Sequence, residues 1–282
     1  MKVGFVGVGA MGEAMAGHVL DRERDEVFVY DIKSEATAAV AAKGAKVAAT
    51  LADMAAAAEF IIVMVVDDKQ TLSVISELTQ AGKKDTLIAV ASTVHPETMI
   101  EAAAIAGEKG LRVMDAPVCF GLYGAKEGSL ASLCGGEKED VERARGVLDA
   151  YSRAVHHIGP LGSGQIAKTV NNMLHWSSCV ANYEALLLAK RFGLDAQALR
   201  EVLLQCPARN GTLADWDSTR FTWPRKDMDI VLDLARKGDL TLPLFGQVDH
   251  LVQLLKPDAV KGLLYGDVAP YLGRDISAMK KE

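Results

Sequence analysis

Cysteine is scarce in this chain, whose 282 residues contain only four, at positions 119, 134, 179 and 206. No two of them form a CxxC pair, so the sequence indicates neither a zinc ribbon nor a redox dithiol. His156 and His157 also lack a partner at the spacing of metal ligands. We therefore predict no metal site and expect four reduced thiols in a reducing compartment.

The chain also lacks a long hydrophobic run. The longest, Phe60–Val66, is far shorter than the roughly 20 residues that cross a bilayer. An apolar strand pattern begins at the N-terminus and leads directly into glycines, whereas a signal peptide has a basic region, a longer apolar stretch and a small-residue cleavage site. We predict a cytoplasmic protein with no membrane partner.

Positive charge is not in excess, because 31 Lys and Arg stand against 37 Asp and Glu, for a formal net charge of −6. No basic stripe is available to displace counterions from phosphates. A nucleic-acid partner is therefore not expected.

The chain is 50% hydrophobic and 24% charged, and it has 25 glycines. This composition is typical of α/β proteins with closely packed helices. Because single hydrophobic cores tend to split into domains near this chain length, two domains are expected.

From Lys2 to about Ile158, short apolar runs alternate with longer amphipathic ones. This alternation is typical of βαβ units, and strands this apolar belong in a parallel sheet covered on both faces, which predicts a doubly wound α/β domain. The expected strands are Lys2–Gly7, Val27–Tyr30, Phe60–Val65, Leu87–Ala91, Leu111–Met114 and Leu130–Cys134. The expected helices are Met11–Leu20, Glu35–Lys43, Lys69–Leu78, Glu97–Lys109 and Glu139–Tyr151.

The character of the sequence changes after the segment Gly159–Gly164. Gln165–Phe192 contains no proline or glycine and keeps helical periodicity, which predicts an unusually long helix. Further helices are expected at Asp195–Gln205, Asp227–Arg236 and Phe245–Leu255, with hardly a strand signal among them. We predict a first domain at 1–160 and an all-α second domain at 161–282.

A glycine fingerprint directly follows the first expected strand. Gly7, Val8, Gly9, Ala10, Met11 and Gly12 form a G-x-G-x-x-G sequence that opens the first expected helix. In a dinucleotide-binding turn, the first glycine permits the tight turn, the second lets backbone approach the pyrophosphate, and the third lets helix and strand pack closely. We predict that these six residues bind a dinucleotide in a Rossmann-type domain.

Asp31 lies nineteen positions after Gly12, at the end of the next expected strand. An acid at this place can accept hydrogen bonds from the adenosine ribose hydroxyls and would repel a 2′-phosphate. We therefore predict NAD as the cofactor, with NADP as the alternative because Lys33 softens that repulsion. The competing interpretation is a Gly-rich turn with a solvated Asp in an unrelated α/β fold.

Two further strand ends carry candidate cofactor contacts. Met64 and Val65 end one expected strand, and Thr93 follows the next. Ligands of open α/β sheets bind at the carboxyl ends of the strands. We predict that these three residues contact the cofactor, with the Thr93 hydroxyl at its nicotinamide end, although ordinary strand exits explain them equally well.

Four separated motifs, read together, are more specific than any one of them. They are Gly7–Gly12; Asp115–Val118 continued by Gly121, Gly124, Gly128 and Gly135–Gly136; Gly162–Gln165 with Lys168, Asn171 and Asn172; and Lys226–Asp227. In this order the set resembles the motifs of the β-hydroxyacid dehydrogenases, the family of 3-hydroxyisobutyrate dehydrogenase and tartronate semialdehyde reductase. The resemblance spans nearly the whole chain.

The resemblance implies residue roles and an assembly. Lys168 would be catalytic, Asn172 would orient the substrate, and Thr93 and Lys226 would contact the cofactor. The loop that would hold the substrate carboxylate consists of Val118, Cys119, Phe120 and Gly121. The second domain would bind substrate and support dimerisation through its long first helix, so a homodimer or homotetramer is expected.

The spacing of Lys168 and Asn172 agrees with these roles, since residues four apart project from one helix face. The Lys168 ammonium can donate a hydrogen bond to a substrate carbonyl oxygen during reduction, and the neutral amine is the base in the oxidative direction. A Lys with an Asn four residues later is also a common solvated helix face.

The chain departs from the family pattern in the substrate loop. Family members commonly carry Ser-Gly where this chain has Cys119 and Phe120. A thiol is a weaker donor than a hydroxyl, and Phe120 adds bulk where a backbone amide would approach a carboxylate. The departure leaves the identity of the acid open.

We predict an oxidoreductase that transfers a hydride between NAD and a small, 3-hydroxyisobutyrate-like β-hydroxyacid or its semialdehyde or keto form. One alternative is an imine reductase on the same fold, which Lys168 disfavours because imine reductases of this architecture generally lack that lysine. Another is a non-catalytic NAD-binding protein, whose sequence sign would be the loss of Lys168.

Overall fold

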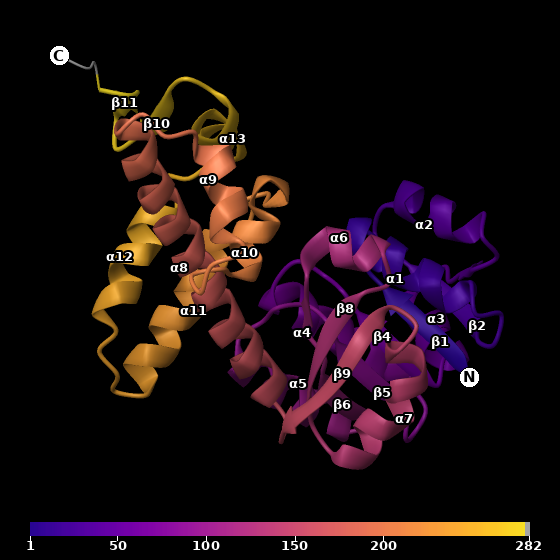
Figure 1. The fold of residues 1–282 in the computed structure, drawn as a ribbon. Helices are drawn as coiled ribbons and strands as arrows, with labels where there is room; N and C mark the ends of the chain where they lie inside the picture. The colour runs from indigo at the N-terminus through magenta and orange to yellow at the C-terminus, as the bar shows by residue number, and fades with distance from the viewer. Residues whose placement is uncertain (280–282) are drawn as a thin grey trace. The chain divides into compact units, whose positions relative to one another are not determined.

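The computed structural model describes residues 1–279, which divide into two compact units (Figure 1). We call Met1–Lys168 the N-terminal unit and the chain from Thr169 onward the C-terminal unit. The division lies inside one continuous helix, α8 (Ser163–Arg191), which begins in the first unit and continues into the second. Each unit has its own hydrophobic core.

A nine-stranded sheet forms the centre of the N-terminal unit, in the order β3-β2-β1-β4-β5-β6-β8-β7, with β9 also paired to β8. The strands are β1 Lys2–Val6, β2 Glu26–Tyr30, β3 Lys46–Val47, β4 Phe60–Val63, β5 Leu87–Val90, β6 Arg112–Asp115, β7 Val118–Cys119, β8 Leu130–Gly135 and β9 Ser152–Gly159. The first six pair in parallel, whereas β8 is antiparallel to β6 and β7 and parallel to β9. The doubly wound prediction is confirmed.

All six expected strands are present, and three strands are additional. Two of these, β3 and β7, have only two residues each, too few for a periodic signal. The third, β9, mixes an arginine and two histidines with apolar side chains and is largely exposed along its length, so its sequence lacks clear alternation. Because of β7 and β8, the sheet is mixed rather than wholly parallel.

The sheet is covered on both faces, as its apolar strands predict. Within β4, Phe60 and Ile62 belong to one buried cluster, and Ile61 and Val63 belong to another. Successive side chains of a strand point to opposite faces, so a run of four buried residues requires helices on both sides. The covering helices are α1 Ala10–Leu20, α2 Ser34–Ala41, α3 Leu51–Ala57, α4 Asp68–Ala81, α5 Pro96–Gly107, α6 Gly121–Lys126 and α7 Lys138–Leu148.

The C-terminal unit is mainly helical, which confirms the predicted fold class. Besides α8, its helices are α9 Ala196–Leu203, α10 Gly211–Ala214, the 3₁₀ helix η1 Trp216–Ser218, α11 Pro224–Lys237, α12 Pro243–Val252 and α13 Pro257–Tyr265. Three of them begin with proline, whose fixed φ and missing N–H suit the first helical position. The fully buried Tyr183 and Trp216 lie in the core of this unit.

One element of the C-terminal unit departs from an all-α domain. Strands β10 (Ala269–Tyr271) and β11 (Arg274–Ile276) form an antiparallel hairpin. Its two-residue turn, Leu272-Gly273, has positive φ at both positions (49° and 72°), as a type I′ turn requires. Leucine is unusual at such a position, so the turn lacks the Asn-Gly signature that predicts a hairpin from sequence.

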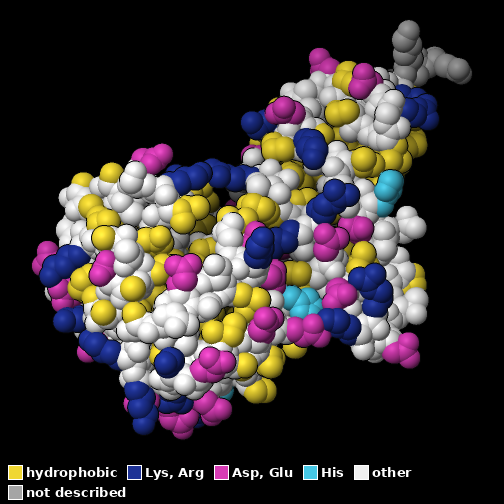
Figure 2. Space-filling model, turned by 180° about the vertical axis from the view of Figure 1, so that it is seen from behind, with side chains coloured by type: hydrophobic (Ala, Val, Ile, Leu, Met, Phe, Trp, Pro, Cys, Tyr) yellow, Lys and Arg dark blue, Asp and Glu magenta, His cyan; other side chains and the backbone are white. Residues whose placement is uncertain are grey.

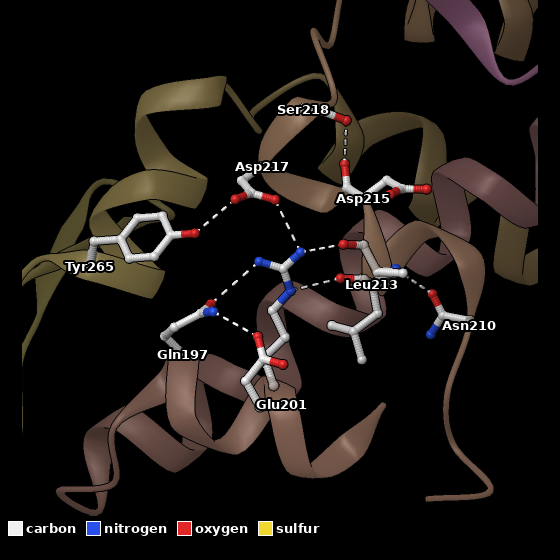
Figure 3. A network of polar contacts seen from close by, with 10 residues as sticks. Gln197, Glu201, Asn210, Leu213, Asp215, Asp217, Ser218 and Tyr265 are labelled. Carbon is white, nitrogen blue, oxygen red and sulfur yellow. Dashed lines mark hydrogen bonds and ion pairs between the residues drawn. The ribbon is translucent and has the colours of Figure 1, made fainter. Parts of the chain in front are cut away.

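Arg200, which is buried, is the centre of a polar network in the C-terminal unit (Figure 3). Its guanidinium donates to Leu213 O at 2.8 Å and pairs with the Asp217 carboxylate at 3.0 Å. The Tyr265 hydroxyl donates to the other oxygen of Asp217 at 2.7 Å. One arginine thereby joins α9, α10, η1 and α13.

Charged side chains of both signs share the surface. On the face drawn in Figure 2, Lys and Arg side chains are interspersed with Asp and Glu side chains. Within residues 1–279, no helix combines the length and apolarity that crossing a bilayer requires. All four cysteines are free, and burial raises the pKa of Cys134 and Cys179 to about 12, so these two thiols stay protonated at neutral pH.

Candidate active site

The glycine fingerprint forms the turn between β1 and α1. Gly7 has φ +87°, and a Cβ there would lie 2.3 Å from the backbone oxygen of Met64. A Cβ on Gly12 would lie 2.0 Å from the backbone oxygen of Gly7, so both positions exclude a side chain. Beside Gly9, in contrast, a Cβ would meet nothing within 4 Å. The turn is therefore closed against the protein and open at Gly9, where α1 begins.

Asp31 follows β2 and lies against the same turn. One carboxylate oxygen accepts a hydrogen bond from Val8 N and the other from Lys33 N, both at 2.9 Å. A carboxylate has about four acceptor sites, so two remain for ligand hydroxyls. Asp31 also lines a surface pocket of about 300 Å³ together with Ile32, Ser34 and other residues. The acid therefore both holds the glycine turn and faces a ligand-sized space.

The loops after β4 and β5 are tied together by Ser92. Its hydroxyl accepts from Val65 N at 2.8 Å and donates to Val65 O at 2.9 Å. Met64 N donates to Val6 O at 2.8 Å, which places this loop beside the glycine turn. Thr93, half-buried, follows Ser92 in the loop after β5. The structure thus brings three strand ends together at the carboxyl edge of the sheet.

Lys168 lies on the second turn of α8, within the N-terminal unit. Its Nζ is 3.9 Å from Sγ of Cys119, which ends β7. Lys168 is half-buried and Cys119 is buried. The predicted proton-transfer group therefore lies next to the predicted substrate loop.

Asp115 and Gln165 are functional candidates whose roles the sequence does not reveal. Asp115 is fully buried at the end of β6, where it accepts hydrogen bonds from Gly162 N at 2.7 Å and Gln165 N at 2.8 Å. Burial raises the pKa of Asp115, although these backbone hydrogen bonds oppose the rise. Both residues lie inside the motifs quoted above, so their positions carried a signal, but their hydrogen-bond partners are 47 to 73 residues away in sequence.

Phe120 occupies a backbone conformation that favours glycine. Its φ of 81° and ψ of 9° are left-handed, which costs a non-glycine residue about 1–2 kcal/mol. Phe120 is 49% exposed, and the Arg153 guanidinium of β9 stacks on its ring at 3.8 Å from the centroid. The chain therefore keeps a bulky aromatic residue at a strained position of the predicted substrate loop.

Two further predicted site residues, Asn172 and Lys226, belong to the C-terminal unit. Asn172 is buried, and its Oδ1 accepts from Nδ2 of Asn171 at 3.1 Å. Lys226 lies in the first turn of α11, with its Nζ 6.0 Å from the centre of the Trp223 ring. The next residue, Asp227, is buried and accepts a hydrogen bond from the Trp176 indole at 2.9 Å, a structural role that explains this acid.

Comparison with known families agrees with this geometry. Residues 2–159 match the model of the NAD-binding domain of 6-phosphogluconate dehydrogenase. Residues 162–263 match the NAD-binding model of NADP-dependent 3-hydroxyisobutyrate dehydrogenase. The chain belongs to the β-hydroxyacid dehydrogenase family.

Individual relatives cover most of the chain. A 3-hydroxyisobutyrate dehydrogenase of Pseudomonas aeruginosa is 35% identical over 75% of this chain and 72% of its own length. A 2-(hydroxymethyl)glutarate dehydrogenase of Eubacterium barkeri is 29% identical over 90% of this chain and 88% of its own length. Among solved structures, Mycobacterium tuberculosis 3-hydroxyisobutyrate dehydrogenase with L-serine has a TM-score of 0.83 and 26% identity, and the match covers 94% of this chain and 99% of that one.

This β-hydroxyacid dehydrogenase is thus an NAD(P)-dependent oxidoreductase of the hydroxyacid type. The predicted family and cofactor class are confirmed.

Proposed function

We propose that this protein catalyses the reversible, NAD-linked oxidation of a small β-hydroxyacid to its semialdehyde or keto form. The observation that carries the proposal is the 3.9 Å separation of Lys168 Nζ and Cys119 Sγ. It brings an amine able to move a proton to the loop that corresponds to the family's carboxylate-binding segment. Relatives named for 3-hydroxyisobutyrate and a structural neighbour containing L-serine support an acid of similar size.

The residues at the glycine turn fit a dinucleotide. The open space at Gly9 and the start of α1 behind it suit a pyrophosphate. The remaining acceptor sites of Asp31 suit the hydroxyls of a ribose. We assign cofactor binding to Gly7–Gly12, Asp31, Met64, Val65, Thr93 and Lys226. When bound, the nicotinamide accepts or supplies the hydride.

Lys168 would move the proton that accompanies this hydride. In the oxidative direction its neutral Nζ takes the proton from the substrate hydroxyl, and in reduction its ammonium returns a proton to the carbonyl oxygen. Asn172, one helical turn further along α8, would orient the substrate with its amide. Val118, Cys119, Phe120 and Gly121 would form the wall that holds the carboxylate.

A substrate panel tests this function. The wild-type protein is assayed with NAD and with NADP against 3-hydroxyisobutyrate, L-serine, and larger, sulfonated and aromatic β-hydroxyacids, and with NADPH and NADH against cyclic imines. We expect turnover of at least one β-hydroxyacid and none of the imines. Turnover of imines alone would replace the proposal with imine reduction, and NADH binding without any turnover would favour a non-catalytic protein.

The proposed preference for NAD rests on Asp31. Replacing Asp31 with alanine should raise the use of NADP relative to NAD by about fivefold, because a like-charge repulsion on the order of 1 kcal/mol is removed. Asp31 also accepts hydrogen bonds from Val8 N and Lys33 N, so the matched variant Asp31→Asn removes the charge while it keeps the shape of the side chain and one of its two acceptors. The ratio of kcat/KM for the two cofactors is the measurement, and an unchanged ratio in both variants would show that the ribose contact is misplaced.

We also propose that the protein works as a homodimer or homotetramer. Ile166, Val170 and Leu174 recur every four residues on α8 and are each about half exposed or more. Apolar residues at this spacing form one stripe on a helix, and such a stripe is a typical contact between subunits. This stripe supports an assembly of at least two chains.

A further inference from the structure

The side chain of Gln165 hydrogen-bonds to the backbone on both sides of Thr93. Its side-chain nitrogen donates to Ser92 O at 2.8 Å, and its side-chain oxygen accepts from Val94 N at 3.1 Å. Gln165 is fully buried, and an unsatisfied polar group in such a place costs about 1–3 kcal/mol. The side chain therefore ties the backbone around Thr93 to the first turn of α8, three residues before Lys168.

Asp115 holds the same helical turn from the end of β6. The first N–H groups of a helix have no partner within the helix, and a carboxylate at this end both accepts from them and interacts favourably with the helix dipole. The helix start is closely packed at Gly164, since a Cβ there would lie 2.6 Å from Asp115 Oδ2 and 2.2 Å from Leu133 O. The start of α8 is thus fixed in position as well as in orientation.

Ser92 extends these contacts to the loop after β4. Because its hydroxyl binds both backbone groups of Val65, a buried polar chain runs from Val65 through Ser92 to Gln165. The backbone N–H of Gln165 continues the chain to Asp115. Both loops assigned above to the cofactor are therefore linked to the helix that carries Lys168.

We propose that Gln165 and Asp115 are positioning residues that hold Lys168 at a fixed spacing from Thr93. The proposal rests on the function proposed above, because Lys168 is the group whose position matters. Neither residue needs to touch a reacting atom. A shift of about 1 Å between a proton-transfer group and its target can lower a rate by on the order of 10²-fold, so a loosened helix start is enough to impair turnover.

The test compares Gln165→Met with Thr79→Val. Methionine has a similar length and no hydrogen-bonding amide, so it removes both contacts at little cost in packing. Thr79 is buried, donates a 2.7 Å hydrogen bond to Ile75 O within α4, and is not assigned to the proposed site, so its variant measures the general effect of losing a buried side-chain hydrogen bond in the same unit. We expect Gln165→Met to lower kcat by about tenfold or more, with the substrate KM and the NADH Kd within about twofold of wild type. Thr79→Val should leave kcat unchanged, whatever its effect on thermal stability.

The kcat values of the two variants decide the proposal. An active wild type whose kcat survives Gln165→Met, or falls no more than in Thr79→Val, overturns the positioning role. If the wild type turns over no acid, the proposed function fails, and amide hydrogen exchange of residues 162–168 becomes the readout. Faster exchange in Gln165→Met alone would then support the positioning role, and unchanged exchange would overturn it. Asp115→Asn, which retains shape and one acceptor, is judged by the same criteria where Gln165→Met does not fold.

Discussion

Replacing Lys168 with alanine is expected to lower kcat by about 10³-fold, within the range that general acid–base groups contribute. This corresponds to about 4 kcal/mol of lost transition-state stabilisation. Without Nζ, the substrate oxygen loses the amine beside Cys119 with which we propose that it exchanges a proton. Steady-state kinetics with the best acid of the panel measure the effect.

Binding measurements separate this loss of chemistry from a loss of structure. The Kd for NADH, followed by nicotinamide fluorescence, and the Tm should stay close to wild type in Lys168→Ala. Lys109→Ala removes the same charge from an exposed position of the same unit and should keep full activity. A small primary amine added to Lys168→Ala should restore part of kcat. Full turnover in the lysine variant would contradict the proposed proton transfer.

Replacing Arg200 with leucine is expected to lower the unfolding free energy of the C-terminal unit by about 3 kcal/mol, the lower end of the range for breaking a buried ion pair. The lower end applies because the Asp217 side chain remains 37% exposed while that of Arg200 is 6% exposed. Leucine also leaves Leu213 O without its donor. All three tryptophans lie in this unit, so tryptophan fluorescence during denaturant unfolding reports its stability.

Arg236→Leu is the matched control, because Arg236 makes an exposed ion pair with Asp233 within α11. Such a surface pair contributes about 0.5 kcal/mol or less, so the control should be nearly as stable as wild type. Equal losses of unfolding free energy in the two variants would show that the network of Figure 3 stabilises the unit no more than an exposed ion pair does.

The Arg200 effect should also depend on pH. Burial alone raises the pKa of Asp217, but hydrogen bonds from Tyr265 and Arg200 outweigh it and hold the pKa below its ordinary value of 3.8. A carboxyl with a lowered folded pKa contributes stability above the unfolded pKa and loses it as the pH falls through the folded pKa. The difference between wild type and Arg200→Leu should therefore be full near neutrality and shrink below about pH 4.

Local patterns in the sequence predict much of this fold. The six main strands carry continuous apolar runs because both faces of the sheet are covered, as Phe60–Val63 illustrates. The glycine turn is also local, since Gly7 and Gly12 lie five residues apart and contact each other. By contrast, the Leu272-Gly273 hairpin lacks a strong turn signature, and β9 lacks alternation.

The candidate site is predictable in its residues but not in its connections. The spacing of Asp31 from the glycine fingerprint can be recognised in the sequence. Its hydrogen bond to Val8, however, spans 23 residues and depends on the parallel pairing of β1 and β2. Gln165 contacts residues more than 70 positions away, across two strand ends. Sequence spacing reveals neighbours along one helix, whereas contacts of this kind arise only when the sheet assembles.

The left-handed backbone at Phe120 makes this position unusually easy to change in the laboratory. Glycine adopts that conformation at no steric cost and asparagine at little, so random replacement at this codon under selection for heat resistance should enrich those two residues. Enrichment of aromatic residues when the same library is selected for turnover would mean that the ring and its stacked arginine take part in choosing the acid. A single codon would then be the place to begin redesigning the substrate range.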